Sequence, residues 1–139
     1  LLEIKIPEKV WNEISVKSVS GDIAMSSLNA NKYNIENTSG NLDFTDCLGD
    51  QHIKTVSGDI KVLDKVLQSN KYLSTTSGDI SLFLPADGNF SLAFKTVSGD
   101  ISNSLNLPMM QSDKRHATAK AGDGKYTISV DSVSGDLIF

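Results

Sequence analysis

The sequence predicts an all-β fold, a right-handed parallel β-solenoid of about six to seven coils with a period of about 19 residues. Three observations support this prediction. A motif of Ser-Gly-Asp followed by Ile or Leu recurs along the chain, beginning with Ser20-Gly21-Asp22. Apolar and polar residues alternate in short runs on both sides of the motif, which is typical of strands. Helix signals are almost absent, and the right hand follows the general chirality of crossover connections.

The motif is predicted to be one corner of the coil, written six times. Glycine at such a corner supplies a positive φ, and the Ser and Asp beside it are turn residues. Five copies carry Asp after the glycine and one carries Asn41. The glycines, spaced by 19, 18, 20, 21 and 36 residues, are Gly21, Gly40, Gly58, Gly78, Gly99 and Gly135; the acids are Asp22, Asp59, Asp79, Asp100 and Asp136.

Columns of similar residues on both sides of each glycine predict the interior of the solenoid. Parallel, in-register stacking of coils explains why each position keeps its residue type. Two residues after the glycine stand Ile23, Leu42, Ile60, Ile80, Ile101 and Leu137, and four after it Met25, Phe44, Val62, Leu82, Asn103 and Phe139. Two before it stand Val19, Thr38, Val56, Thr76, Val97 and Val133, and five before it Val16, Ile35, Ile53, Leu73, Phe94 and Val130.

The last two columns are out of phase by one residue, so we expect a bend or bulge between them. A further short inward-facing wall is predicted at Leu28, Leu48, Val66 with Leu67, and Leu84. An alternative fold remains open, because Ser-Gly or Gly-Asp between apolar runs also signals a hairpin. Six hairpins would give an antiparallel sandwich or barrel of about twelve short strands. The strict columns favour the solenoid, since a meander does not need identical corners.

The chain is long enough for one domain, which we place over residues 1–139. Residues 1–12, with the alternation Leu2-Ile4-Ile6 and then Trp11, are expected to cap the first coil. Residues 103–125 break the pattern and are predicted to be an irregular loop excursion. Residues 126–139 then form the final coil.

Three groups of residues are candidates for metal binding or catalysis. A row of carboxylates can bind a cation such as Ca²⁺. The same row is also expected at a solvent-exposed corner that binds no metal, and we favour this second interpretation. The serines Ser20, Ser39, Ser57, Ser77, Ser98 and Ser134 lack a base at a repeated offset, since the histidines are His52 and His116. Cys47, Asp50 and His52 are too few ligand types for a metal site. We therefore expect no catalytic residues, no metal and no cofactor.

One possible partner surface stands in the irregular stretch. Met109 and Met110 precede the basic run of Lys114, Arg115 and His116. Such a run can bind an anionic polymer or lipid head group, although it is more often a solvated loop.

The amino-acid composition limits the classes of partner that we expect. The formal net charge is -4, the pI is about 5.0 and mean hydropathy is -0.16, so no basic footprint for nucleic acid is present. No apolar run approaches the roughly 20 residues of a membrane-spanning helix. A single cysteine fits a cytosolic protein or an extracellular bacterial one. Because the sequence opens on Leu rather than Met, we expect a piece of a longer protein.

At these columns the chain resembles the putative-adhesin β-repeat domain of bacteria. The stretches that carry the resemblance are "TVSGDI", "LPADGNFSLAFKTVSGDI" and "GDGKYTISVDSVSGDLIF". The resemblance implies a domain of unknown biochemical function, found in cell-envelope proteins and in some relatives linked to envelope stress. It implies no catalytic residues. Asn41 and Asn103 depart from the repeat.

The predicted function is a non-enzymatic interaction module at the bacterial cell envelope or surface, with a protein or glycan partner. One alternative is a structural or regulatory module that self-associates through the exposed strand edges at the solenoid ends, including the last strand at Phe139. A polysaccharide-active β-helix enzyme is the third hypothesis, with Asp59 and Asp79 as its testable acids.

Overall fold

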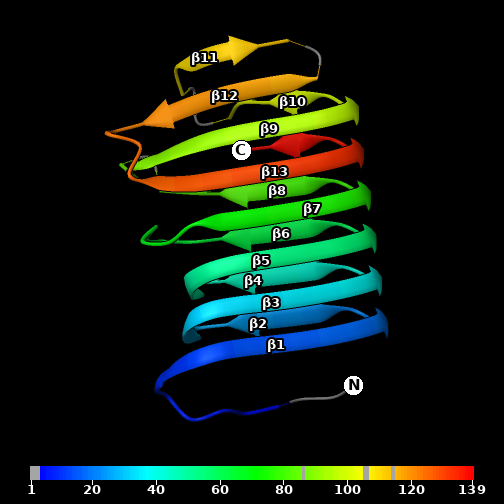
Figure 1. Ribbon diagram of the computed structural model, residues 1–139, viewed down its shortest axis with the longest axis vertical. Coiled ribbons are helices and arrows are strands. Elements are labelled where there is room, and N and C mark those ends of the chain that lie inside the picture. Colours follow the sequence, from blue (N-terminus) through cyan, green and yellow to red (C-terminus); the bar gives the residue numbers. More distant parts are fainter. Residues whose placement is uncertain (1–3, 86, 105–106, 114) are drawn as a thin grey trace.

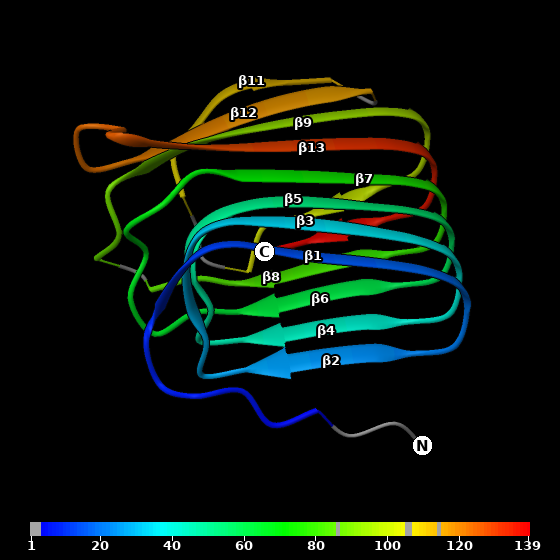
Figure 2. The ribbon, with the colours of Figure 1, turned by 60° about the horizontal axis from the view of Figure 1, so that its bottom comes forward.

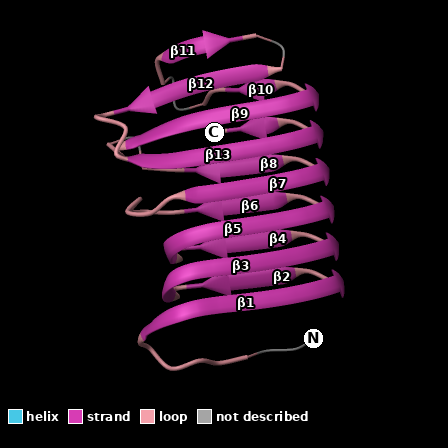
Figure 3. Ribbon diagram, viewed as in Figure 1, coloured by secondary structure: helices cyan, strands magenta, loops and turns pink. Residues whose placement is uncertain are grey.

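The computed structural model describes residues 4–85, 87–104, 107–113 and 115–139. Strands and loops make up these ranges, with no helix among them (Figure 3). The prediction of an all-β fold is confirmed. Within the same ranges, no helix has the length and apolar character needed to cross a membrane.

Long and short strands alternate along most of the chain. The long strands are β1 (Val10–Ser20), β3 (Asn29–Ser39), β5 (Leu48–Ser57), β7 (Lys71–Ser77), β9 (Phe90–Ser98) and β13 (Tyr126–Ser134). The short strands that follow them are β2 (Ile23–Ser26), β4 (Leu42–Thr45), β6 (Ile60–Leu63), β8 (Ile80–Phe83), β10 (Ile101–Ser102) and β14 (Leu137–Ile138). Two further strands, β11 (Met109–Ser112) and β12 (His116–Ala121), lie between β10 and β13.

The long and short strands form two facing sheets that enclose the core (Figure 2). The larger has eight strands in the order β1-β3-β5-β7-β13-β9-β12-β11, and the smaller has six in the order β10-β14-β8-β6-β4-β2. The repeating strands pair in parallel and in register, so that Leu42 faces Ile23 on one side and Ile60 on the other. Parallel pairing rules out the hairpin alternative for the repeats. Among the described strands, antiparallel pairing occurs between β11 and β12 and between β12 and β9.

The last two strands lie inside the stack. β13 is placed between β7 and β9, and β14 between β8 and β10 (Figure 1). Residues 126–139 are therefore last in sequence but do not end the solenoid, which differs from the prediction of a final coil. The columns explain how this is possible, because Val130 matches Leu73 of β7 and Phe94 of β9 equally well.

The stretch predicted as an irregular excursion contains ordered strands. β12 pairs antiparallel with β9 from Ala121↔Phe90 to His116↔Lys95, and β11 pairs with β12. Ala117, Ala119 and Ala121 of β12 are buried, so this hairpin covers the end of the core beyond β9. Alternating alanines are weak strand signals, which is why the sequence pattern did not reveal β12.

The interior confirms three of the four predicted columns and corrects the fourth. In the coils at the centre of the stack, Ile53, Ile60 and Val62 represent the columns that face inward and are fully buried. Val19, Val56, Val97 and Val133, two residues before the glycine, instead face solvent with 75%, 46%, 61% and 49% of their surface exposed. The inward residues lie one position earlier, at Asn37, Thr55, Thr75, Thr96 and Ser132.

The predicted bulge between these columns is therefore wrong. Between these two columns the long strands alternate without a break, as in Ile53 buried, Lys54 exposed and Thr55 buried. The expected further wall is uneven, with Leu67 and Leu84 buried, Leu28 partly buried, and Leu48 and Val66 exposed. At the other end, Trp11 already belongs to β1 and packs against the core, while its Nε1 donates to the carbonyl of Pro7 at 3.3 Å.

Candidate binding face

The motif corner is a close stack of glycines. Gly58 has a φ of +138°, and a Cβ there would overlap the carbonyl oxygen of Gly40. The same contact recurs from corner to corner, in the order Gly21, Gly40, Gly58, Gly78, Gly135 and Gly99. Glycine is needed both for the backbone conformation and for the approach of neighbouring coils.

The acids after the glycines form a hydrogen-bond ladder along this corner. Each Oδ1 accepts the backbone N–H of the residue at the same position in the next coil, at 2.8 to 3.2 Å. Asn41 continues the ladder, because its amide oxygen accepts as a carboxylate oxygen does. The ladder runs through Asp22, Asn41, Asp59, Asp79, Asp136 and Asp100.

The corner offers no arrangement for catalysis or metal binding in the part of the chain that the structure describes. The motif serines are exposed on the outside of the corner. No group of three or more His, Cys, Asp or Glu residues in the described ranges is placed to hold a metal ion. The repeated motif is therefore a structural device that joins adjacent coils.

Cys47 and His52, close in sequence, are separated by the larger sheet. Cys47 is buried in the core, where its Sγ lies 3.6 Å from the carbonyl oxygens of Met25 and Thr45, and burial raises the pKa of its thiol. His52 lies exposed on the outer face of β5. The two side chains therefore do not form a joint site.

The predicted partner surface lies at the far end of the larger sheet. Met109 and Met110 belong to β11, the outermost strand, and Lys114 lies outside the described residues. Arg115 is exposed in the turn before β12. Asp113 accepts the N–H groups of Arg115 and His116 at 2.7 Å, and these bonds lower the pKa of its carboxyl. An acid thus stands directly before the basic run.

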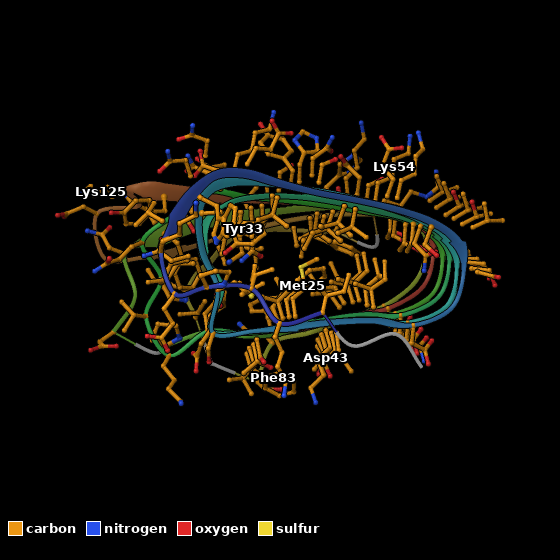
Figure 4. All side chains as sticks on the ribbon, turned by 90° about the horizontal axis from the view of Figure 1, so that it is seen from below. Met25, Tyr33, Asp43, Lys54, Phe83 and Lys125 are labelled. Carbon is orange, nitrogen blue, oxygen red and sulfur yellow. The ribbon has the colours of Figure 1, made fainter. Side chains whose placement is uncertain are left out.

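A hollow on the outer face of the larger sheet is the strongest candidate for a binding site. It has a volume of about 420 Å³ and is lined by Lys32, Asp50, Gln51, His52, Asn70, Tyr72 and Thr127. The rings of His52 and Tyr72 stack with centroids 5.1 Å apart and planes 12° from parallel. Tyr72 keeps 49% of its surface exposed. Figure 4 shows this outer face from the end of the stack, with Lys54 pointing outward and Tyr33 pointing into the core.

The neighbours of Tyr72 leave one side of its ring open. His52, its register partner on β5, stacks against one face of the ring. The partner on the other side is Ser129 of β13, followed by Ala93 of β9. Both side chains are small, so neither of them covers the second face of the Tyr72 ring.

The polar rim of the hollow is held by backbone contacts. Asp50 Oδ1 accepts the N–H of Asn70 at 2.9 Å, and Asn70 Oδ1 accepts the N–H of Thr127 at 2.9 Å. As at the motif corner, a side-chain Oδ1 accepts a backbone N–H of the neighbouring coil. These bonds fix two polar side chains beside the aromatic pair. Lys32 adds a cation at the same rim.

Sequence reasoning singled out Asp50 and His52 but missed Tyr72, Asn70 and Lys32. The available signal was the row of outward positions in the long strands. Asn34, His52 and Tyr72 share this row with Ser129, Ala93 and Thr118. Residue type varies along it, so it does not stand out as a repeat.

A family model named Toastrack DUF4097 matches residues 3–138. The chain belongs to the Toastrack DUF4097 family. The Toastrack match covers nearly the whole chain, and the family is one of unknown function. No curated protein matches the sequence.

A solved structure also resembles this Toastrack chain. It is a crystal structure of a putative cell adhesion protein from Clostridium sporogenes, with 13% identity and a TM-score of 0.50. The match covers 77% of this chain and 55% of that protein, so the Toastrack chain spans little more than half of its length. At this identity the likeness shows the fold alone.

Proposed function

We propose that this Toastrack domain is a non-enzymatic interaction module of the bacterial cell envelope, and that it binds a glycan in the hollow around Tyr72. The observation that carries the proposal is the stacked His52–Tyr72 pair inside a rim of polar side chains. The coils are expected to wind right-handed, about six to seven in number, so that the face is flat and regular.

The chemistry of the hollow suits a sugar. A sugar ring has an apolar face of C–H groups that packs on an aromatic ring, and hydroxyl groups at its edge that both donate and accept. Tyr72 supplies the aromatic surface. Lys32 offers donors, while Asp50 and Asn70 offer oxygen acceptors and an amide. Apolar surface with a few fixed polar groups is the usual composition of small-ligand sites.

The envelope location draws support from the structural neighbour. That protein is called a putative cell adhesion protein, and such a function is exercised at the cell surface. The single, buried Cys47 and the pI of about 5.0 are compatible with this location.

The test is a glycan array followed by titration calorimetry on any hit. We expect Tyr72→Ala to weaken binding at least about tenfold, the range of one lost aromatic contact. Phe83→Ala is the matched control, because Phe83 is also an aromatic residue with 49% exposure but lies on the smaller sheet. Equal affinity of both variants, or an array no better than that of an unrelated β-protein, would refute the proposal.

Self-association is the second candidate. β1 and β2 occupy one end of the two sheets, where their outer edges have no partner strand among the described residues. Exposed edges of this kind can pair with another chain. The prediction of an exposed strand edge at Phe139 is wrong, because β14 lies between β8 and β10. Light scattering that shows a monomer at high concentration would exclude this candidate.

The enzyme hypothesis has little to support it at the proposed acids. Oδ1 of Asp59 and Oδ1 of Asp79 both accept backbone N–H groups of the corner ladder. We propose that these acids act in structure and not in hydrolysis.

A further inference from the structure

A lysine and an aspartate meet inside the core at one end of the coil. Asp64 follows β6, and Lys71 begins β7 after a short loop, so both belong to one turn of the chain. Lys71 Nζ lies 2.5 Å from Asp64 Oδ2. Their side chains are 0% and 3% exposed.

The pair is enclosed by buried residues. The register partners of Lys71 are Gln51 on β5 and Ile128 on β13, both buried, and Leu67 and Leu73 are buried nearby in sequence. Asp64 Oδ1 is buried with no hydrogen-bond partner in the described part of the chain. An ion pair in such a place loses the solvation of both charges and leaves one carboxylate oxygen uncompensated.

We propose that Lys71 and Asp64 condense without an added enzyme to form an intramolecular isopeptide bond, a covalent clamp inside the core. A proton first passes from the ammonium group to the carboxylate, which gives a neutral amine and a carboxylic acid. The amine nitrogen attacks Cγ of Asp64, and a proton from that nitrogen passes to the leaving hydroxyl. A C–N bond forms, a C–O bond breaks and one water leaves, with no change in oxidation state.

Two features of the site favour this reaction. The reacting groups are already in contact, and well-oriented groups react with effective concentrations of about 10⁵–10⁸ M. Burial favours the neutral forms, and it lowers the pKa of Lys71 even though Asp64 opposes that shift. In water, solvation would stabilise the two ions and so disfavour their condensation. Here both groups are buried and lack that solvation, and the water that the reaction releases passes into the bulk solvent.

The chain contains its own controls. Lys17 contacts Glu36 at 2.8 Å and Lys65 contacts Asp46 at 3.0 Å. These distances are similar, but the side chains of Lys17 and Lys65 are 80% and 78% exposed. Exposed pairs keep their hydration, so both should remain ordinary ion pairs.

Intact mass spectrometry of the denatured wild-type chain tests the proposal. We expect a mass about 18 Da below the sequence mass, which is the loss of one water. Trypsin should then cut after Lys61 and Lys65 but not after Lys71. The fragment 62–65 should stay attached to the fragment 66–95, with the mass deficit in that linked pair.

Each outcome decides the question. A full sequence mass, with fragments 62–65 and 66–71 released separately, would overturn the bond and leave a buried ion pair. A deficit that maps to Lys17–Glu36 or Lys65–Asp46 would overturn the argument from burial. The Asp64→Ala variant should show the full mass, and a deficit that persists in this variant would also overturn the assignment. None of these readouts depends on glycan binding.

Discussion

Asp79 Oδ1 accepts the backbone N–H of Asp136 at 2.8 Å, although 57 residues separate the two in sequence. Asp136 in turn accepts the N–H of Asp100, so the inserted coil is bonded on both sides. The motif acid therefore links one coil to the next instead of closing its own turn. This explains why the residue recurs and why an amide can replace it at Asn41.

Replacing Asp79 by Ala should remove this link at one rung. The N–H of Asp136 then has only water as its partner, and we expect a loss of about 0.5–1.5 kcal/mol in the free energy of unfolding. Asp79→Asn is the matched control, since it keeps the accepting oxygen and should cost much less. Urea unfolding of the two variants beside the wild type provides the measurement. Equal stabilities of the two variants would contradict the ladder.

The glycine stack gives a second pair of variants. Gly21 and Gly58 both have a positive φ, at 115° and 138°, and Ala at either position incurs strain of about 1–3 kcal/mol. Of these two positions, an added Cβ meets another coil only at Gly58, because a Cβ at Gly21 has nothing within 4 Å. Gly58→Ala should therefore cost a further 1–3 kcal/mol or so, typical of overpacking. Thermal unfolding tests this, and a larger loss at Gly21 would show that the stack is not close-packed.

The column of buried polar residues three positions before each motif glycine gives a third pair of variants. Thr75 is 2% exposed, and its hydroxyl has no hydrogen-bond partner in the described part of the chain, whereas Thr55 donates to the carbonyl of Ser57 at 3.5 Å. Thr75→Val removes a buried unpaired group at constant shape and should raise stability by about 1 kcal/mol. Thr55→Val should lower it by about 0.5 kcal/mol. Guanidinium unfolding gives both values, and a Thr75→Val variant less stable than the wild type would indicate a partner for this hydroxyl.

The sequence predicted the repeat, the parallel pairing and the inward columns at Ile60 and Val62. The prediction that Val56, and not Thr55, faces inward was wrong, because both residues are β-branched and both suit a strand. The structure places the polar residue inside, and at two corners this residue donates to a carbonyl. The Nδ2 of Asn37 donates to the carbonyls of Gly21 and Gly40 at 3.1 and 3.3 Å, and the hydroxyl of Thr55 donates to that of Ser57 at 3.5 Å.

The order of the coils could not be predicted for a related reason. Because every coil carries the same residue types, the strand around Val130 fits beside Leu73, Phe94 or any similar neighbour. The position of β13 depends on the antiparallel hairpin of β11 and β12. In this hairpin β12 pairs with one edge of β9, which leaves the other edge of β9 to β13. The candidate site was missed likewise, because Tyr72 stands in a row whose residues do not repeat.

Asp46 provides a prediction about pH. Its Oδ1 accepts the N–H of Lys65 and its Oδ2 contacts Lys65 Nζ, each at 3.0 Å, and these contacts lower the pKa of its carboxyl below the usual 3.8. A carboxyl with a lowered pKa in the folded state stabilises the protein above its unfolded pKa. That contribution is lost as the pH falls through the folded pKa.

The Asp46→Asn variant isolates this contribution. Asn keeps an accepting oxygen and tolerates the φ of 50° found at this position, so the fold should be retained. We expect the variant to be less stable than the wild type at pH 7, and the difference to shrink as the pH falls below 3.8. Urea unfolding at several pH values measures the difference, in which carboxyls shared by both proteins cancel. A difference that does not change with pH would mean that the charge on Asp46 does not contribute to the stability of the fold.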